Sequence, residues 1–149
     1  MKKWIKISII AVIALALFGI YYFKNHGNDI SKGKGSEKAL AWENYNPDDD
    51  KDKKIPMLLE LGSPTCPACR RMEPTLEDFR KKYGDNVIVK KINIESGDNY
   101  ALAKKYNVRL MPTFIFLDEN SDLKGRYEGM LTLESIEKVF NSMGVKANE

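Results

Sequence analysis

Cysteine and histidine are scarce in this sequence, which has two cysteines and one histidine among its 149 residues. A small secreted domain stabilised by structural disulfides would use more cysteines and would spread them along the chain. A structural zinc site needs about four ligands, which two thiols and one distant imidazole do not supply. We therefore expect no disulfide framework, no resident metal site and no cofactor. His26 lies in a polar N-terminal stretch and is interpreted as a solvated side chain.

A strong excess of charge of one sign is also missing. Lysine and arginine number 24, aspartate and glutamate number 21, and the net charge is +3. Because the basic residues are offset by acidic neighbours, the charge does not indicate nucleic-acid binding. The proportions of hydrophobic residues, 43%, and charged residues, 30%, suit a globular protein and exclude a fully disordered chain.

The one long hydrophobic run lies near the N-terminus, over residues 7–23. Lys2, Lys3 and Lys6 precede this run, and aromatic residues stand at both of its ends, as is typical of membrane interfaces. At ~1.5 Å per residue a helix of this length reaches about 25 Å, near the lower limit for crossing a bilayer. The positive charges place residues 1–6 in the cytoplasm and the domain outside it. The pattern predicts a single-pass protein of the cell membrane.

A cleaved signal peptide is the competing interpretation of the same run, because Ala14-Leu15-Ala16 satisfies the small-residue rule for cleavage. Cleavage there would leave the apolar residues 17–23 on the mature N-terminus, so we favour an uncleaved anchor. The polar residues 24–54 are predicted to be a linker. Within this linker, residues 36–45 contain an apolar island that is compatible with a short helix packed on the domain.

From residue 55 onward, the hydrophobic pattern alternates between strands and helices. Nearly continuous apolar runs predict strands buried on both faces, and apolar residues at spacings of three and four predict helices. The expected strands are 57–61, 87–94, 113–117 and 123–127, and the expected helices are 67–83, 98–106 and one that begins after Thr132. This order predicts an α/β domain over residues 55–142, with a mixed four-stranded sheet flanked by helices, and a tail over residues 143–149.

Both cysteines lie where the first strand gives way to the first helix. Pro67 suits the first turn of a helix, which places Cys66 at the helix N-terminus and Cys69 one turn further on. Unpaired backbone N–H groups and the helix dipole stabilise an anion at this position. We therefore predict that the Cys66 thiolate attacks a sulfur of a partner and that Cys69 resolves the mixed disulfide.

Other uses of the cysteine pair can be compared with redox exchange. Attachment of a c-type haem requires a histidine after the second cysteine, where Arg70 stands. A purely structural disulfide closing so small a loop would add little stability. Copper delivery by the two thiolates is chemically feasible and stays open as an alternative.

The order of these motifs resembles the thioredoxin superfamily over residues 55–140. The resemblance rests on five features in the expected order: the cysteine pair after the first core strand, Pro74 five residues after Cys69, Lys91-Ile92-Asn93-Ile94, Met111-Pro112-Thr113, and Gly129. It implies a thioredoxin-like fold and a protein-disulfide oxidoreductase. Pro74 would kink the first helix, as the corresponding proline does in the family.

The resemblance also assigns roles to residues outside the cysteine pair. It implies a cis bond before Pro112, facing the cysteines, and it implies that the backbone of Met111 binds a substrate peptide like an added strand. Thr65 and Pro67, which flank Cys66, would complete the substrate-binding surface. Glu60, six residues before Cys66, stands where the family carries a buried carboxyl.

A carboxyl buried at Glu60 would have a raised pKa and could take a proton from Cys69 during resolution. The resemblance implies that Lys91 approaches this carboxylate. Thioredoxins carry Trp and Gly-Pro where this sequence has Thr65 and Pro67-Ala68, and the residues between the cysteines tune the reduction potential. The direction of electron flow is therefore open.

Three functions are consistent with these residues. The first is a monomeric reductase that acts on the disulfides of extracytoplasmic proteins and receives electrons from a membrane thiol–disulfide carrier. The second is a disulfide oxidase or isomerase of the same fold. The third is a non-catalytic copper-handling module.

Overall fold

A computed structural model describes Phe18 and residues 40–148 of the chain. The chain divides into two compact units, residues 1–36 and 37–149, and the fold described below belongs to the second. The predicted anchor at residues 7–23 and the N-terminal segment 1–6 lie, apart from Phe18, outside the described residues. Within the part of the chain that is described, no helix has the length and apolar character needed to cross a membrane.

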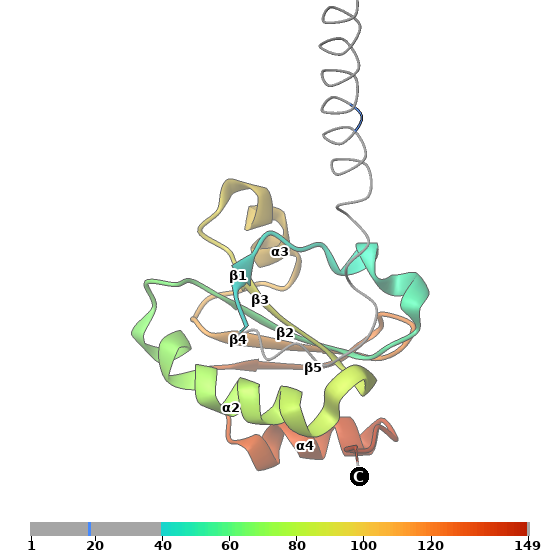
Figure 1. Cartoon of the computed structure of the whole chain (residues 1–149). Helices are drawn as coiled ribbons and strands as arrows, with labels where there is room; N and C mark the ends of the chain where they lie inside the picture. The colour runs from blue at the N-terminus through green and yellow to red at the C-terminus, as the bar shows by residue number, and fades with distance from the viewer. Residues whose placement is uncertain (1–17, 19–39, 149) are drawn as a thin grey trace, which may run out of the picture. The chain divides into compact units, whose positions relative to one another are not determined.

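A mixed five-stranded sheet forms the centre of the domain (Figure 1). Its strands are β1 (Trp42–Glu43), β2 (Met57–Gly62), β3 (Ile88–Asn93), β4 (Thr113–Leu117) and β5 (Leu123–Glu128), in the spatial order β1-β3-β2-β4-β5. The strand β3 runs parallel to both β1 and β2, whereas β4 runs antiparallel to both β2 and β5. The helical crossover between β2 and β3 makes these two strands parallel. The connection after β3 brings β4 in antiparallel beside β2, so the expectation that both long connections give parallel strands is wrong, and the tight turn before β5 makes an antiparallel hairpin.

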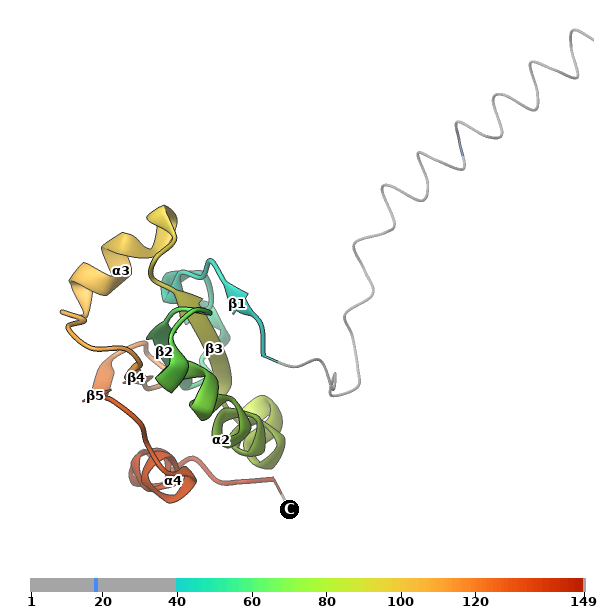
Figure 2. The same ribbon diagram turned by 90° about the vertical axis from the view of Figure 1, so that its left-hand side faces the viewer.

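Helices cover both faces of the sheet. Figure 2 shows α2 (Pro67–Tyr83) and α4 (Leu133–Ser142) on one face and the short α3 (Tyr100–Lys105) on the other. Proline opens α2 because the first turn needs no N–H from it, and Gly84 ends α2 with a φ of +52°. Thr132 caps α4 by accepting a hydrogen bond from the Ser135 N–H, so the predicted cap is confirmed.

The sheet is buried on both sides, which follows from the apolar pattern of β2. On one face, Leu58 packs with residues of α2 and α4, including Phe79 and Phe140. On the other face, Leu59 packs with residues that include Leu102 of α3. Side chains alternate along a strand, so Glu60 shares the α2 face with Leu58.

The prediction of four strands is wrong, because residues 42–43 add a fifth. Trp42 pairs with Lys91 and Glu43 with Ile92, which extends the sheet beyond β3. The predicted linker is therefore structured from β1 onward, and two short 3-10 helices follow at Pro47–Asp49 and Lys51–Lys53. The proposed short helix is not found over residues 40–45. A two-residue strand carries no periodic pattern, and the free backbone groups of the β3 edge supply its pairing.

The C-terminal residues also differ from a free tail. Met143, Val145 and Ala147 pack against the cluster between the sheet, α2 and α4. The backbone N–H of Asn148 donates to the carbonyl oxygen of Lys82 at 2.9 Å. These contacts hold residues 143–148 of the predicted tail against the domain.

Candidate active site

Cys66 occupies the capping position of α2, where the sequence predicted it. Its Sγ accepts a hydrogen bond from the backbone N–H of Cys69 at 3.2 Å, so the helix N-terminus points a donor at the sulfur. Both cysteines are present as free thiols. The exposed fraction is 9% for Cys66 and 0% for Cys69, so the first sulfur can be reached from solvent and the second lies behind it. This order suits an attacking and a resolving thiol.

The Cys69 thiol is held in its protonated form. Burial raises its pKa, and so do its hydrogen bond with Cys66 and the nearby charge of Glu60, while the backbone of Ser63 opposes the shift. A buried thiol of this kind attacks a disulfide only after it loses its proton. The site therefore needs a proton acceptor close to Cys69.

Glu60 supplies a carboxyl in the required place. It lies in the middle of β2, paired with Lys91 of β3 and Phe114 of β4, and is fully buried. Neither carboxylate oxygen has a hydrogen-bond partner among the described residues. Burial raises the pKa of Glu60 to about 7. The charge of Lys91 and the nearby Cys69 thiol lower this pKa in part, although the thiol does not form a hydrogen bond with either oxygen. A carboxyl with this pKa can both accept and release a proton near neutral pH.

Lys91 adjoins Glu60 in the strand register but forms its ion pair elsewhere. Its ammonium lies 2.5 Å from Oε1 of Glu73 on α2 and 4.4 Å from the centre of the Trp42 ring. Lys91 therefore lies next to Glu60 through the pairing of their strands, as predicted, but its ammonium does not contact the Glu60 carboxyl. Sequence reasoning missed both Glu73 and Trp42, since neither belongs to a recognisable motif.

Gly62 permits close packing behind the cysteines. A Cβ atom at this position would come within 2.7 Å of Cys69 Sγ and 3.0 Å of the Trp42 ring. Such distances are shorter than van der Waals contact, so only glycine allows Trp42 and Cys69 to approach from both sides. A glycine ending an otherwise apolar strand is the one signal in the sequence that could have indicated this.

The segment before β4 adopts the conformation that the resemblance implied. The Met111–Pro112 peptide bond is cis, and the Pro112 carbonyl oxygen accepts a hydrogen bond from the Gly129 N–H at 2.8 Å. Thr113 pairs with Leu61 near the end of β2, so the proline lies at the same end of the sheet as the loop carrying Cys66. Pro74 lies inside α2, as expected.

A hydrogen-bonded loop holds the residues just before Cys66. The Ser63 hydroxyl lies 2.8 Å from the Thr65 hydroxyl, accepts the Thr65 N–H at 3.1 Å, and donates to the carboxylate of Glu95. The Thr65 hydroxyl also reaches that carboxylate, at 3.3 Å. Thr65 and Pro67 are both exposed beside Cys66, as a substrate-binding role requires. Glu95, which sequence reasoning missed, fixes this loop from the segment after β3.

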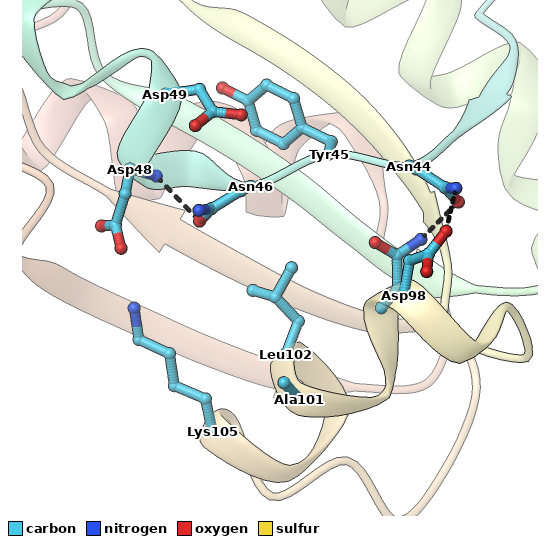
Figure 3. A pocket seen from close by; sticks show the side chains of 10 residues that line it. Asn44, Tyr45, Asn46, Asp48, Asp49, Asp98, Ala101, Leu102 and Lys105 are labelled. Atoms are coloured by element: carbon cyan, nitrogen blue, oxygen red, sulfur yellow. Dashed lines mark hydrogen bonds between the residues drawn. The ribbon is translucent and has the colours of Figure 1, made fainter.

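A separate pocket of about 410 Å³ lies between the segment after β1 and the start of α3 (Figure 3). Within it, Asn44 donates to Asp98 at 2.9 Å, and the backbone N–H of Asp48 donates to Asn46 at 3.1 Å. The pocket is lined by Asn44, Tyr45, Asn46, Asp48, Asp49, Asp98, Asn99, Ala101, Leu102 and Lys105, none of which the sequence indicated as a site residue. It contains no group that takes part in the thiol chemistry.

The thioredoxin family profile matches residues 37–142, which is most of the chain and includes β1. The chain belongs to the thioredoxin family. Membership and the paired cysteines support a thiol–disulfide oxidoreductase in general terms. The start of the match before Trp42 agrees with the structure, in which the domain begins earlier than the sequence pattern predicted.

Curated thioredoxins show the similarity at the sequence level. The chain is 33% identical to a thioredoxin of Buchnera aphidicola over 90 residues, covering 60% of this chain and 80% of that protein. It is 35% identical to thioredoxin-1 of Drosophila melanogaster over 72 residues, covering 48% of this chain and 64% of the fly protein. A thiol:disulfide interchange protein TxlA homologue of Synechocystis is 26% identical over 117 residues, covering 77% of this chain and 62% of that protein. The matches to the fly and Synechocystis proteins thus span less than two thirds of those proteins.

Solved structures show the same fold. A thioredoxin-like protein of Clostridium perfringens superposes with a TM-score of 0.55 at 32% identity, covering 63% of this chain and 75% of that one. A thioredoxin variant of Halobacterium salinarum gives a TM-score of 0.60 at 21% identity, covering 74% of this chain and 95% of that one. The second similarity, at low identity, concerns the fold alone.

Proposed function

We propose that this protein reduces disulfides in protein substrates through Cys66 and Cys69. One arrangement supports the proposal. A reachable sulfur stands at the start of α2 and a buried thiol follows one turn further. The buried carboxyl of Glu60 is near enough to that thiol to shift its pKa. In the first step, the Cys66 thiolate attacks one sulfur of the substrate disulfide. A Cys66–substrate disulfide forms, the substrate disulfide breaks, and the other substrate sulfur leaves as a thiolate that takes up a proton.

The second step releases the substrate. Glu60 accepts the proton of Cys69, and the resulting thiolate attacks Cys66 Sγ. The Cys66–Cys69 disulfide forms as the bond between Cys66 and the substrate breaks, and the second substrate sulfur leaves as a thiolate. The substrate gains two electrons and the enzyme loses two, so a donor of the thiol–disulfide class must reduce the enzyme before the next cycle.

Substrate binding involves the surface around the cis bond. The backbone of Met111 pairs with an extended substrate segment in the manner of an added strand. Thr65 and Pro67 contact the same segment on the other side of Cys66. The half-buried Met111 and the two exposed residues beside Cys66 support this arrangement.

The cellular setting follows from the N-terminal pattern. We infer an uncleaved anchor at residues 7–23, a domain outside the cytoplasm, and a membrane thiol–disulfide carrier as electron donor. The lysines before the apolar run and the aromatic residues at its ends support the anchor and its orientation. Recovery of the full chain in the soluble fraction of broken cells would contradict this inference.

The reduction potential of the Cys66–Cys69 couple tests the direction of electron flow. A protein that reduces the disulfides of other proteins needs a potential well below that of a strong oxidant, so we expect a value near that of thioredoxin, about −270 mV. The full chain is equilibrated with glutathione or dithiothreitol buffers, and the dithiol fraction is measured by thiol alkylation and mass spectrometry. A value of about −120 mV is typical of a strong oxidant, and it would contradict the reductase and favour a disulfide oxidase.

A further inference from the structure

Two carboxylates lie within reach of Lys91. Glu60 is its neighbour in the register of β2 and β3, and Glu73 faces it from α2. The exposed fraction of the Lys91 side chain is only 1%, so its charge must be balanced by a partner inside the protein. The choice between these carboxylates decides whether Glu60 is locked in an ion pair.

The structure shows Lys91 engaged with Glu73. The ammonium lies 2.5 Å from Glu73 Oε1 and 4.4 Å from the centre of the Trp42 ring, so a carboxylate and an aromatic face both hold it. The Glu73 side chain is 46% exposed and keeps access to water, while both oxygens of the fully buried Glu60 have no hydrogen-bond partner among the described residues.

We propose that Glu73 is a positioning residue that holds the Lys91 ammonium away from Glu60 and so leaves the buried carboxyl free to accept the Cys69 proton. The inference rests on the proposed exchange reaction but does not depend on its direction. The resemblance to the thioredoxin family implied the carboxyl and the lysine near the cysteines, and the structure adds Glu73 as a second carboxylate that competes for this lysine.

The physical argument concerns how strongly Glu60 binds a proton. A direct ion pair with Lys91 would favour the charged carboxylate and weaken it as a base. When Glu73 neutralises the Lys91 ammonium, this ammonium attracts the Glu60 carboxylate less strongly. The negative charge of Glu73 also repels a charged Glu60, so both effects make Glu60 bind its proton more tightly. The titratable groups that face Glu60 are Lys91 on β3 and Cys69 and Glu73 on α2, while its neighbour on β4 is the neutral Phe114.

The direct test is the titration of Glu60 in the full chain with its cysteines reduced. The carboxyl carbon of ¹³C-labelled glutamate is followed by NMR against pH in the wild type and in Glu73→Gln, and Glu60→Gln identifies the signal. Removing Glu73 should let Lys91 turn to Glu60, so we expect the midpoint to move down by about one pH unit. An unchanged or higher midpoint would overturn the proposal.

Three further variants make this result specific. Glu77→Gln removes the same charge from the same helix, at a residue that pairs with Arg80 instead of Lys91, and should leave the midpoint unchanged. Glu73→Asp keeps the charge and should restore most of the wild-type midpoint. Glu73→Ser removes the charge with a smaller side chain and is the second variant if Glu73→Gln does not fold. A shift as large in Glu77→Gln, or no recovery in Glu73→Asp, would contradict the positioning role.

The titration also separates this proposal from the exchange reaction. If the wild type exchanges disulfides and Glu73→Gln leaves the Glu60 midpoint unchanged, the positioning role fails while the proposed function stands. If the wild type does not exchange disulfides, the proposed function fails whatever the midpoint.

Discussion

The chemistry at the residue scale depends on two groups that the protein holds in unusual protonation states. Burial raises the pKa of the Cys69 thiol, which prevents it from attacking spontaneously, and burial also raises the pKa of Glu60 to about 7. The two groups have complementary roles, because the Cys69 thiol keeps its proton until it is attacked by a base, and a carboxyl with a raised pKa is a stronger base than an ordinary carboxylate. The cost is that a charged Glu60 is poorly solvated inside the sheet.

This cost predicts how stability changes with pH. The carboxyl of Glu60 titrates near 4.5 in the unfolded chain and near 7 in the folded one, so the folded state binds its proton more tightly. The free energy of unfolding should therefore fall as the pH rises through this window, by about 3 kcal/mol. Glu60→Gln should lack this decline. Urea unfolding of both proteins with their cysteines reduced, at several pH values, measures the difference.

Other carboxyls change the free energy of unfolding below the pH range in which Glu60 titrates, and they change it in the opposite direction. Ion pairs and hydrogen bonds lower the pKa of Asp50 and Glu77 against the opposing effect of burial, so these residues add stability as the pH rises above their folded values. Parallel stability profiles for the wild type and Glu60→Gln between about pH 4.5 and about pH 7 would show that Glu60 is not a shifted carboxyl.

At the scale of elements, the site is assembled where β1, β2 and α2 meet. Trp42 from β1 and Cys69 from α2 approach Gly62 at the end of β2, and the same Trp42 ring lies beside the Lys91 ammonium. The two-residue strand β1 therefore does more than extend the sheet. It brings an aromatic ring to the back of the cysteine site.

A methyl group at Gly62 tests this packing. Gly62→Ala would place a Cβ within 2.7 Å of Cys69 Sγ, so the ring of Trp42 or the start of α2 must move. We expect the free energy of unfolding of the dithiol form to fall by about 1 to 3 kcal/mol, measured by urea unfolding. The matched control is Gly97→Ala, where a Cβ would meet no atom within 4 Å. Equal stability of Gly62→Ala and the control would show that the contact is not tight.

The sequence predicted the elements that carry their own pattern. The helix at Pro67–Tyr83 and the strand at Thr113–Leu117 are found at their expected bounds, because apolar spacing, Pro67 and Gly84 mark them locally. The strand β1 was missed because two residues show no periodicity. Glu73 was missed for a different reason. Its role depends on whether the long side chain of Lys91 points toward β2 or toward α2, and the sequence does not show this.

At the scale of the whole molecule, the chain combines a thioredoxin domain with an N-terminal segment in which lysines precede an apolar run. The domain extends from before β1 to Asn148. We propose that its surface around Cys66 and Met111 binds extended protein segments. The basic and apolar pattern of residues 1–23 leads us to propose that this domain works at a membrane. A reductase placed there would meet exported proteins as its substrates.

The proposed mechanism requires that Cys66 attacks a protein disulfide and that Cys69 releases the product. The most direct measurement is covalent trapping in intact cells that produce the full chain as Cys69→Ser, with Cys66→Ser as the matched control. Cells are quenched with acid, and adducts in the membrane fraction are separated without reductant and identified by mass spectrometry. Cys69→Ser should accumulate mixed disulfides through Cys66, because the resolving thiol is absent, and Cys66→Ser should accumulate almost none. Adducts on Cys66→Ser together with none on Cys69→Ser would reverse the two roles and contradict the mechanism.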